Sequence, residues 1–463
     1  MVSAQYPMAF DEQYHFGLIQ LHAHQWLPFF TSQPTDSGAY GAIARDPSYL
    51  YHWLMSLPYR LIALFTPNQT TQIICLRVIN VALFAYALTL YRTLVRRIGA
   101  SRALTNSLFA VFVLIPVVPF LAATINYDNL LMVAIPVSML LGLRVMKDFR
   151  EKRVSAPALL GLCTVLLLAS LIKFPFLPVF AVMVLYSVWL AWHEGLLNRR
   201  GVRGFTASYT SLSVVRRIVL LAACLLAFGL FAERYMVNAA VYHVPVPACD
   251  AVIGHDTCME YGPYGRDAQY KMNKPATFRP NFFVFAWEWL YGMWFRLYFA
   301  INQNYYTRKP LFVVSWIGVV GAVTLAVGIL MRFRSLFRGN RTRQLIAWVT
   351  AGYIMTLFLD NFKGYAKTGM PVAINGRYLI PFLLFLFAFG GIAWSKILHR
   401  HTVVKTTTAS IVIALLLLQG GGTMTYILRA AGDDWYWNNS VVRSVNRSIQ
   451  KAALPVIIER HWN

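Results

Sequence analysis

Ten long apolar segments between residues 72 and 427 constrain the fold of this chain more than any other feature. An α-helix rises 1.5 Å per residue, so about 20 apolar residues cross the hydrocarbon core of a bilayer. Only 13% of the residues are charged, against about 25% in soluble domains. The sequence therefore predicts an all-α polytopic membrane protein with about ten transmembrane helices, at residues 72–95, 104–123, 129–146, 156–172, 175–193, 214–234, 311–332, 344–360, 378–396 and 404–427.

The connections between these segments differ in charge, and the difference predicts the topology. The net charge is +24, and the basic residues gather in alternate connections. Cytoplasmic loops carry an excess of Lys and Arg, so we expect residues 96–97, 147–153, 199–217, 332–343 and 396–405 to be cytoplasmic. No basic domain remains to bind nucleic acid. The chain divides into an external segment (1–71), six helices (72–234), an external loop (235–310), four helices (311–427) and an external tail (428–463).

The first 71 residues contain an acidic motif and no spanning segment. If residues 11–26 are helical, Asp11, His15 and His22 lie within an arc of about 60°, because each residue turns the helix by 100°. Such a stripe indicates either a functional face or a solvated amphipathic helix on the membrane surface. A second interfacial helix is expected at Trp53–Phe65, after an N-cap at Asp46-Pro47-Ser48. An external segment without a leader predicts one more helix before Met1, which would make eleven.

The external loop 235–310 contains two further features. Cys249 and Cys258 lie nine residues apart, and we expect them to form a disulfide outside the cytoplasm. Cys75, Cys163 and Cys224 lie in apolar runs, and neither CxxC nor zinc-site spacing occurs. Residues 281–306 hold 12 aromatic residues in 26, which indicates an interfacial helix with an aromatic belt or a platform for a sugar or prenyl chain.

Ionisable residues at the predicted outer ends of the helices are the candidate site. They are Asp128, Lys173 and Arg377, the last followed by Tyr378. Each has a structural alternative, since Asp128 can cap a helix, Lys173 can snorkel and Arg377 can face lipid headgroups. Together with Asp11 and Glu12, they combine carboxylates, which accept a hydroxyl proton or hold a divalent cation, with cations suited to phosphate. A lipid-linked phosphosugar needs both.

At these motifs the chain resembles the GT-C superfamily of polytopic glycosyltransferases, especially bacterial relatives of protein mannosyltransferases and aminoarabinose transferases. The resemblance rests on five short motifs spread over nearly the whole chain. It departs from the family in having no helix before the acidic loop and no soluble C-terminal domain. The motifs are Phe10-Asp11-Glu12 with His15, Asp46-Pro47-Ser48 with Tyr51-His52, Asn126-Tyr127-Asp128, Lys173-Phe174-Pro175 and Gly376-Arg377-Tyr378-Leu379-Ile380-Pro381.

The resemblance implies an inverting transfer of a sugar from a polyprenyl-phosphate donor to a hydroxyl of a glycan, lipid or protein acceptor. Asp11, Glu12 and His15 would be catalytic, with Asp11 as the base. Glu12 would orient backbone donors or share a divalent metal, Mg or Mn, with Asp11. Asp128, Lys173, Arg377 and Tyr378 would bind the substrate. We expect a bacterial inner-membrane protein with an outward-facing site. A transporter or flippase of lipid-linked saccharides, or an inactive assembly protein, are the alternatives.

Overall fold

The computed structural model describes residues 4–8, 11–301, 306–310, 312–424 and 440–453. Within these residues, seven helical stretches are long and apolar enough to cross a membrane. This supports an integral membrane protein. The helices that form the main part of these stretches are α3 (Gln69–Arg97), α6 (Asp128–Arg150), α8 (Leu177–His193), α10 (Val214–Phe231), α16 (Phe312–Met331), α18 (Arg341–Thr368) and α19 (Ile380–Ile397).

The other three predicted segments are helical but differ in form. Two are single apolar helices of 17 residues, α7 (Ala156–Ile172) and α20 (Thr402–Leu418). The third is a bent pair, α4 (Arg102–Val113) and α5 (Val117–Ala123), with an angle of 77° between its helices. Pro116 lies at the break, where its missing N–H and its ring prevent a continuous helix. Each of the ten predicted segments therefore contains a helix, and seven helical stretches reach spanning length unbroken. The last predicted segment runs to residue 427, but its helix ends at Leu418, and residues 425–427 lie outside the described part of the chain.

Short polar side chains set the beginnings of several of these helices. Asn68 accepts a hydrogen bond from the Thr71 amide at the start of α3. Asn340 does the same for α18, and Ser101 and Ser155 do so for α4 and α7. These caps satisfy backbone donors that have no partner within the helix. They lie just outside the apolar runs, so the helices begin where the composition changes.

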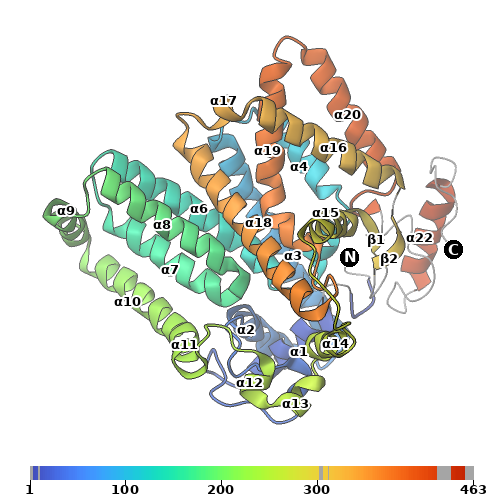
Figure 1. Ribbon diagram of the computed structural model, residues 1–463, viewed down its shortest axis with the longest axis horizontal. Coiled ribbons are helices and arrows are strands. Elements are labelled where there is room, and N and C mark those ends of the chain that lie inside the picture. The colour runs from blue at the N-terminus through green and yellow to red at the C-terminus, as the bar shows by residue number, and fades with distance from the viewer. Residues whose placement is uncertain (1–3, 9–10, 302–305, 311, 425–439, 454–463) are drawn as a thin grey trace.

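Short helices gather at one end of the bundle (Figure 1), and this end carries the candidate site. The opposite end carries α9 (Arg199–Thr210) and α17 (Phe333–Phe337), which lie in two of the basic connections. The helices at the site end are α1 (Glu12–Ala23), η1 (Gly38–Tyr40), α2 (Leu50–Phe65), α12 (Cys249–Ile253), α13 (His255–Met259) and α14 (Gly262–Met272). The short turns and helices adjoining the spanning helices are η2 (Phe174–Phe176), η3 (Ala232–Met236), α11 (Val237–Tyr242) and η4 (Gly376–Leu379).

The predicted cap at Asp46-Pro47-Ser48 is corrected by the structure. The residue before α2 is Tyr49, and it makes no side-chain cap. Asp46 instead accepts a hydrogen bond from the Ser48 amide, and Ser48 Oγ accepts one from the Phe174 amide. This segment therefore ties the first seventy residues to the junction between α7 and α8.

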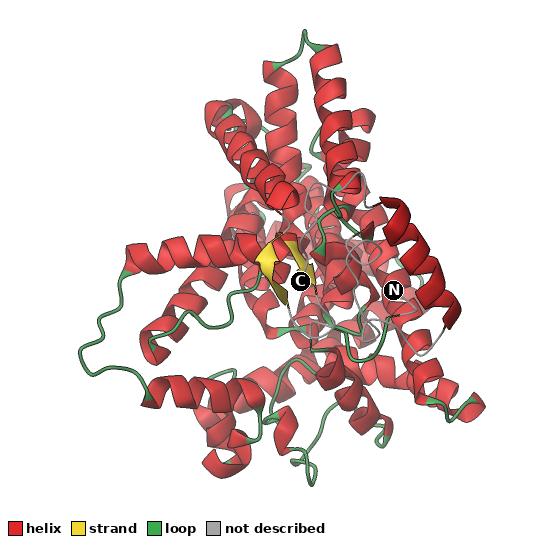
Figure 2. Ribbon diagram, turned by 90° about the vertical axis from the view of Figure 1, so that its right-hand side faces the viewer, coloured by secondary structure: helices red, strands yellow, loops and turns green. Residues whose placement is uncertain are grey.

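The aromatic stretch forms α15 (Phe282–Tyr298), a helix with a buried and an exposed face. Phe285, Trp289 and Met293 are buried together with Tyr365 of α18, while Phe283 on the other face is 82% exposed. A short antiparallel hairpin follows, β1 (Phe299–Ile301) with β2 (Tyr306–Pro310), a small departure from the all-α prediction (Figure 2). The last described helix is α22 (Ser440–Ala453).

Candidate functional site

Glu12 is fully buried and lies at the centre of a polar junction. Both of its oxygens accept hydrogen bonds from Arg77 of α3, at 2.8 Å from Nε and 2.7 Å from Nη2. The amides of Met8 and Ile125 donate to the same carboxylate at 2.7 and 3.3 Å. A buried carboxylate is stable only when its charge and lone pairs are satisfied in this way. Glu12 thus joins α1, α3 and the corner between α5 and α6.

Asp11 faces the other way, and its side chain is 61% exposed. It precedes α1 in the left-handed conformation, with φ 63°, which turns its side chain away from the course of the helix. Its Oδ2 accepts a hydrogen bond at 2.7 Å from Nη2 of Arg377, whose side chain is only 7% exposed. The two neighbouring carboxylates therefore have different partners and different access to solvent.

Packing against α15 positions Arg377. A Cβ on the preceding Gly376 would lie 2.2 Å from the Met293 carbonyl oxygen, so a larger residue would push η4 away from α15. The Asn375 side chain accepts from the Arg377 amide, and Arg296 of α15 donates to the Ile374 carbonyl. The aromatic helix therefore acts in the structure as a support for the arginine segment.

Lys173 and Asp128 form a second ion pair, which is buried. Lys173 Nζ lies 2.6 Å from Asp128 Oδ1. The ammonium also lies over the rings of Tyr127 and Tyr378, at 4.4 and 4.7 Å from their centroids. Asp128 Oδ2 is buried and has no hydrogen-bond partner among the residues that the structure describes. Asp128 Oδ2 can therefore accept one more hydrogen bond. Such a bond would be favourable, because leaving a buried acceptor without a partner costs free energy.

Three histidines form a buried column between α1 and α2. His15 Nδ1 lies 2.9 Å from His52 Nε2, and the His52 ring is nearly parallel to that of His22. Burial lowers the pKa of His15 well below its usual value, and the charges of Arg377 and Lys173 lower it further. Burial likewise lowers the pKa of His52, and it lowers that of His22 to about 3. Burial therefore favours the neutral form of all three rings.

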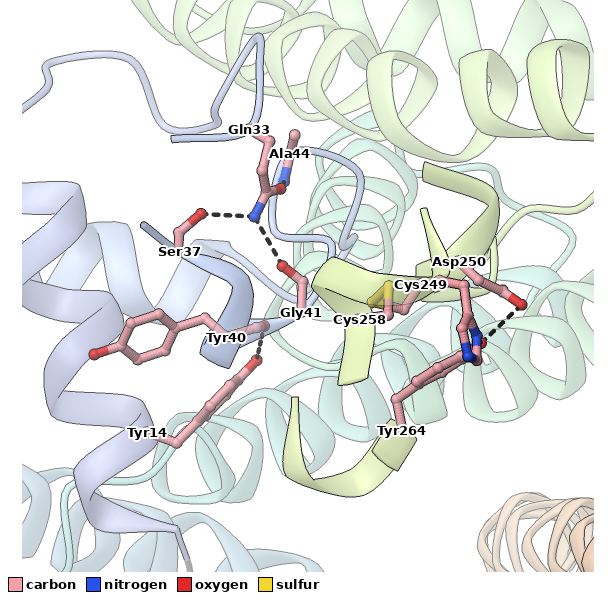
Figure 3. Close-up of a disulfide and its surroundings, with 11 residues drawn as sticks. Tyr14, Gln33, Ser37, Tyr40, Gly41, Ala44, Cys249, Asp250, Cys258 and Tyr264 are labelled. Atoms are coloured by element: carbon pink, nitrogen blue, oxygen red, sulfur yellow. Dashed lines mark hydrogen bonds between the residues drawn. A yellow bond between two sulfur atoms is a disulfide. The ribbon is translucent and has the colours of Figure 1, made fainter. Parts of the chain in front are cut away.

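A disulfide-bonded segment lies over the loop that follows α1. Cys249 and Cys258 are bonded, with their Cα atoms 5.9 Å apart (Figure 3). Close contacts join this segment to the loop, because a Cβ on Gly38 would meet Glu260 and one on Gly41 would meet the Tyr261 ring. Tyr261 also lies 6.1 Å from Tyr14 of α1, centroid to centroid. The disulfide-bonded segment thus covers the face of α1 that carries Tyr14.

Seven residues predicted for the site lie in one region, where they form two ion pairs with one another and, with residues outside the prediction, a third ion pair and a histidine pair. Sequence reasoning missed Arg77 as the partner of Glu12 and His52 as the partner of His15. An arginine inside the first apolar segment was a usable signal, since charges within a membrane span are costly. The sequence signal for His52 was weaker, because only the packing of α2 on α1 brings His52 next to His15. The predicted residues are Asp11, Glu12, His15, Asp128, Lys173, Arg377 and Tyr378.

The predicted divalent metal needs oxygen ligands with free lone pairs. Both Glu12 oxygens already receive two hydrogen bonds, so Glu12 does not fit as a ligand. Among the described residues, no group of three or more His, Cys, Asp or Glu side chains is arranged to hold a metal. Of the two carboxylates, Asp11 is the one that a metal ion in solution could reach. Metal dependence stays a prediction.

Comparisons of the chain with protein families, curated proteins and solved structures found no match.

Proposed function

We propose that this chain is a membrane glycosyltransferase that moves a sugar from a polyprenyl-phosphate donor to an acceptor hydroxyl, with inversion at the anomeric carbon. The observation that supports this most is the exposed Asp11 carboxylate held against the Arg377 guanidinium, 2.7 Å apart, beside a buried Lys173–Asp128 pair. A carboxylate that can take a hydroxyl proton is thus in direct contact with a guanidinium that can hold a phosphate.

In the proposed reaction the donor phosphate takes the place of Asp11 on Arg377. The buried guanidinium keeps an anionic partner throughout this exchange, and the released Asp11 carboxylate is already largely exposed to solvent, so no buried charge is left uncompensated. A phosphate dianion or diester matches the planar donors of arginine and forms charge-assisted hydrogen bonds. The released Asp11 carboxylate then accepts the proton of the attacking hydroxyl while the C–O bond to the phosphate breaks.

The second ion pair has a different part in this proposal. Lys173 is held by Asp128 and two tyrosine rings, so it adds positive potential next to the phosphate without leaving its partners. Asp128 Oδ2 has a free acceptor position, which suits a hydroxyl of the transferred sugar. The centroid of the Tyr378 ring lies 5.3 Å from Arg377 Cζ and 4.7 Å from Lys173 Nζ, so this ring adjoins the position proposed for the phosphate.

The proposal includes the wider setting of the site. All ten apolar segments would cross the bilayer, with the bent pair α4–α5 as one crossing and α7 and α20 as short ones. The basic connections would face the cytoplasm of a bacterium, so the site would face outward from the inner membrane. Glycans, lipids and proteins outside the cytoplasm are then the available acceptors.

Purified protein in liposomes tests the proposal with a panel of polyprenyl-phosphate sugars. We expect one donor to be consumed, with transfer of its sugar to an added membrane extract and release of polyprenyl phosphate. Chelation of divalent cations in the same assay tests metal dependence. Absence of transfer from every donor, together with movement of intact lipid-linked sugar between leaflets, would contradict the proposal.

That second outcome corresponds to the alternative function, a transporter or flippase of lipid-linked saccharides. One observation favours it, the 77° break between α4 and α5, since transporters use broken helices at their substrate sites. The ionisable groups nevertheless gather at the ends of helices, near Asp11, which directly precedes α1. Groups at helix ends suit a reaction at the membrane surface better than transport through the bilayer.

Arg377→Lys tests the phosphate assignment within this proposal. Lysine keeps the charge but loses the planar pair of donors, and a lost charge-assisted hydrogen bond costs about 1.5–3 kcal/mol. We therefore expect donor affinity to fall by roughly tenfold or more. Arg296→Lys on α15 is the control for disturbance of the segment. Unchanged donor affinity in Arg377→Lys and Arg377→Ala would remove the assignment.

A further inference from the structure

The last described helix, α22, has two faces of different chemistry. Its fourteen residues, SVVRSVNRSIQKAA, include three basic and no acidic residues. At 100° per residue, Val441, Val445 and Ile449 lie within an arc of about 80°, and Arg443, Arg447 and Lys451 lie within another of about 80° on the far side. Ser444 and Ser448 lie between the two arcs on one flank, and Ser440 lies within the basic arc.

The apolar face of α22 is exposed. The exposed fractions are 69% for Val441, 52% for Val445 and 38% for Ile449. The basic residues and serines line a hollow of about 450 Å³ on the other side. An exposed apolar stripe with a basic row on the opposite face is the pattern of helices that lie in a membrane interface.

We infer that α22 lies on the surface of the bilayer that the spanning helices cross, and that anionic phospholipid is its partner. The charge is complementary, because three cations and no anions face a negatively charged headgroup layer. The bilayer is also within reach, since α22 follows the apolar helix α20 in the chain. Each basic residue near an anionic surface strengthens binding about fivefold. This inference is independent of the reaction at the acidic motif.

Fluorescence of the full chain in liposomes tests the inference. Cys75, Cys163 and Cys224 are replaced by serine, the disulfide is kept, and Val445→Cys is labelled with bimane. In vesicles with phosphatidylglycerol we expect strong quenching by nitroxide-labelled lipid and protection from acrylamide. A label at Ser440→Cys, about 140° around the helix, should show the opposite. In vesicles of phosphatidylcholine alone, quenching at position 445 should fall.

Charge variants separate lipid binding from simple packing. Arg447→Glu with Lys451→Glu should weaken the quenching by lipid at least tenfold in apparent partition, whereas Arg447→Lys with Lys451→Arg should preserve it. High salt should reproduce the loss. Equal access of acrylamide to both labels would overturn the inference. So would oxidative cross-linking of the unlabelled Val445→Cys variant between two copies of the chain, because the partner would then be protein.

Discussion

Two adjacent carboxylates, Asp11 and Glu12, have opposite environments, and this difference assigns their roles. Glu12 is enclosed and receives four hydrogen bonds. Asp11 is exposed, and its carboxylate contacts the tip of Arg377. The left-handed backbone at Asp11 separates the two side chains. Chemistry therefore belongs to Asp11 in our proposal, and structural support belongs to Glu12.

Asp11→Asn should lower the rate of sugar transfer by about 10²–10⁴-fold, because an amide cannot accept the hydroxyl proton. Asparagine tolerates the left-handed conformation, so the backbone should not change. Donor affinity should stay the same or rise, because the amide no longer competes as an anion for Arg377. Transfer kinetics and donor binding by titration measure the two effects. Near-normal turnover in this variant would exclude Asp11 as the base.

Glu12→Gln should act through stability. Removing one partner of a buried ion pair costs about 3–5 kcal/mol, since the remaining charge is uncompensated. Arg77→Met should cost a similar amount, and the double variant should be clearly more stable than the sum of the two losses implies. Unfolding of the purified variants in detergent checks this. Additive losses would show that the two side chains do not interact.

At the scale of elements, α1 is held by three different neighbours. The histidine column attaches it to α2, the Glu12–Arg77 pair attaches it to α3, and Tyr261 of the disulfide-bonded segment covers Tyr14. The Cys249–Cys258 bond limits the freedom of that segment. The start of the chain is thus fixed by contacts distant in sequence, which keeps Asp11 at the tip of Arg377.

The histidine column makes stability depend on pH. The folded pKa values of His15, His22 and His52 lie below the usual 6.5, so the unfolded chain binds more protons in mildly acidic solution. Stability should therefore be complete above about pH 6.5 and fall as the pH decreases, by at most about 1.4 kcal/mol per pH unit for each histidine. Thermal unfolding between pH 7.5 and 5 measures the slope. His22→Gln should reduce it, with exposed His401→Gln as the control; an unaltered slope in His22→Gln would contradict the assignment.

At the scale of the molecule, the two ends of the helical bundle differ in composition. One end carries the site, the disulfide and the short helices, and the other carries α9, α17 and their arginines (Figure 1). A bundle with one basic end has a preferred orientation in a bilayer. The position of the site at the less basic end is what makes an outward-facing reaction the natural proposal.

Thiol labelling of intact cells tests that orientation. In a background where Cys75, Cys163 and Cys224 are serine, a membrane-impermeant maleimide should label Lys271→Cys of α14 and leave Arg338→Cys, after α17, unlabelled. Permeabilised cells should show labelling at both positions. Labelling of Arg338→Cys in intact cells would reverse the topology. Reductant should expose Cys249 and Cys258 to the same probe only when the site end is outside.

Local composition by itself determined the membrane class, the approximate positions of the helices within ten apolar segments, and the candidate site residues. The length of a hydrophobic segment and the charge of a loop depend on adjacent residues only, so both can be recognised in the sequence without knowledge of the packing. Only the tertiary structure decided which partner each charge has. Glu12 meets Arg77, Asp11 meets Arg377 and His15 meets His52 across 65, 366 and 37 residues. Such pairings depend on how helices pack, and on a left-handed residue and a glycine contact that no periodic pattern encodes.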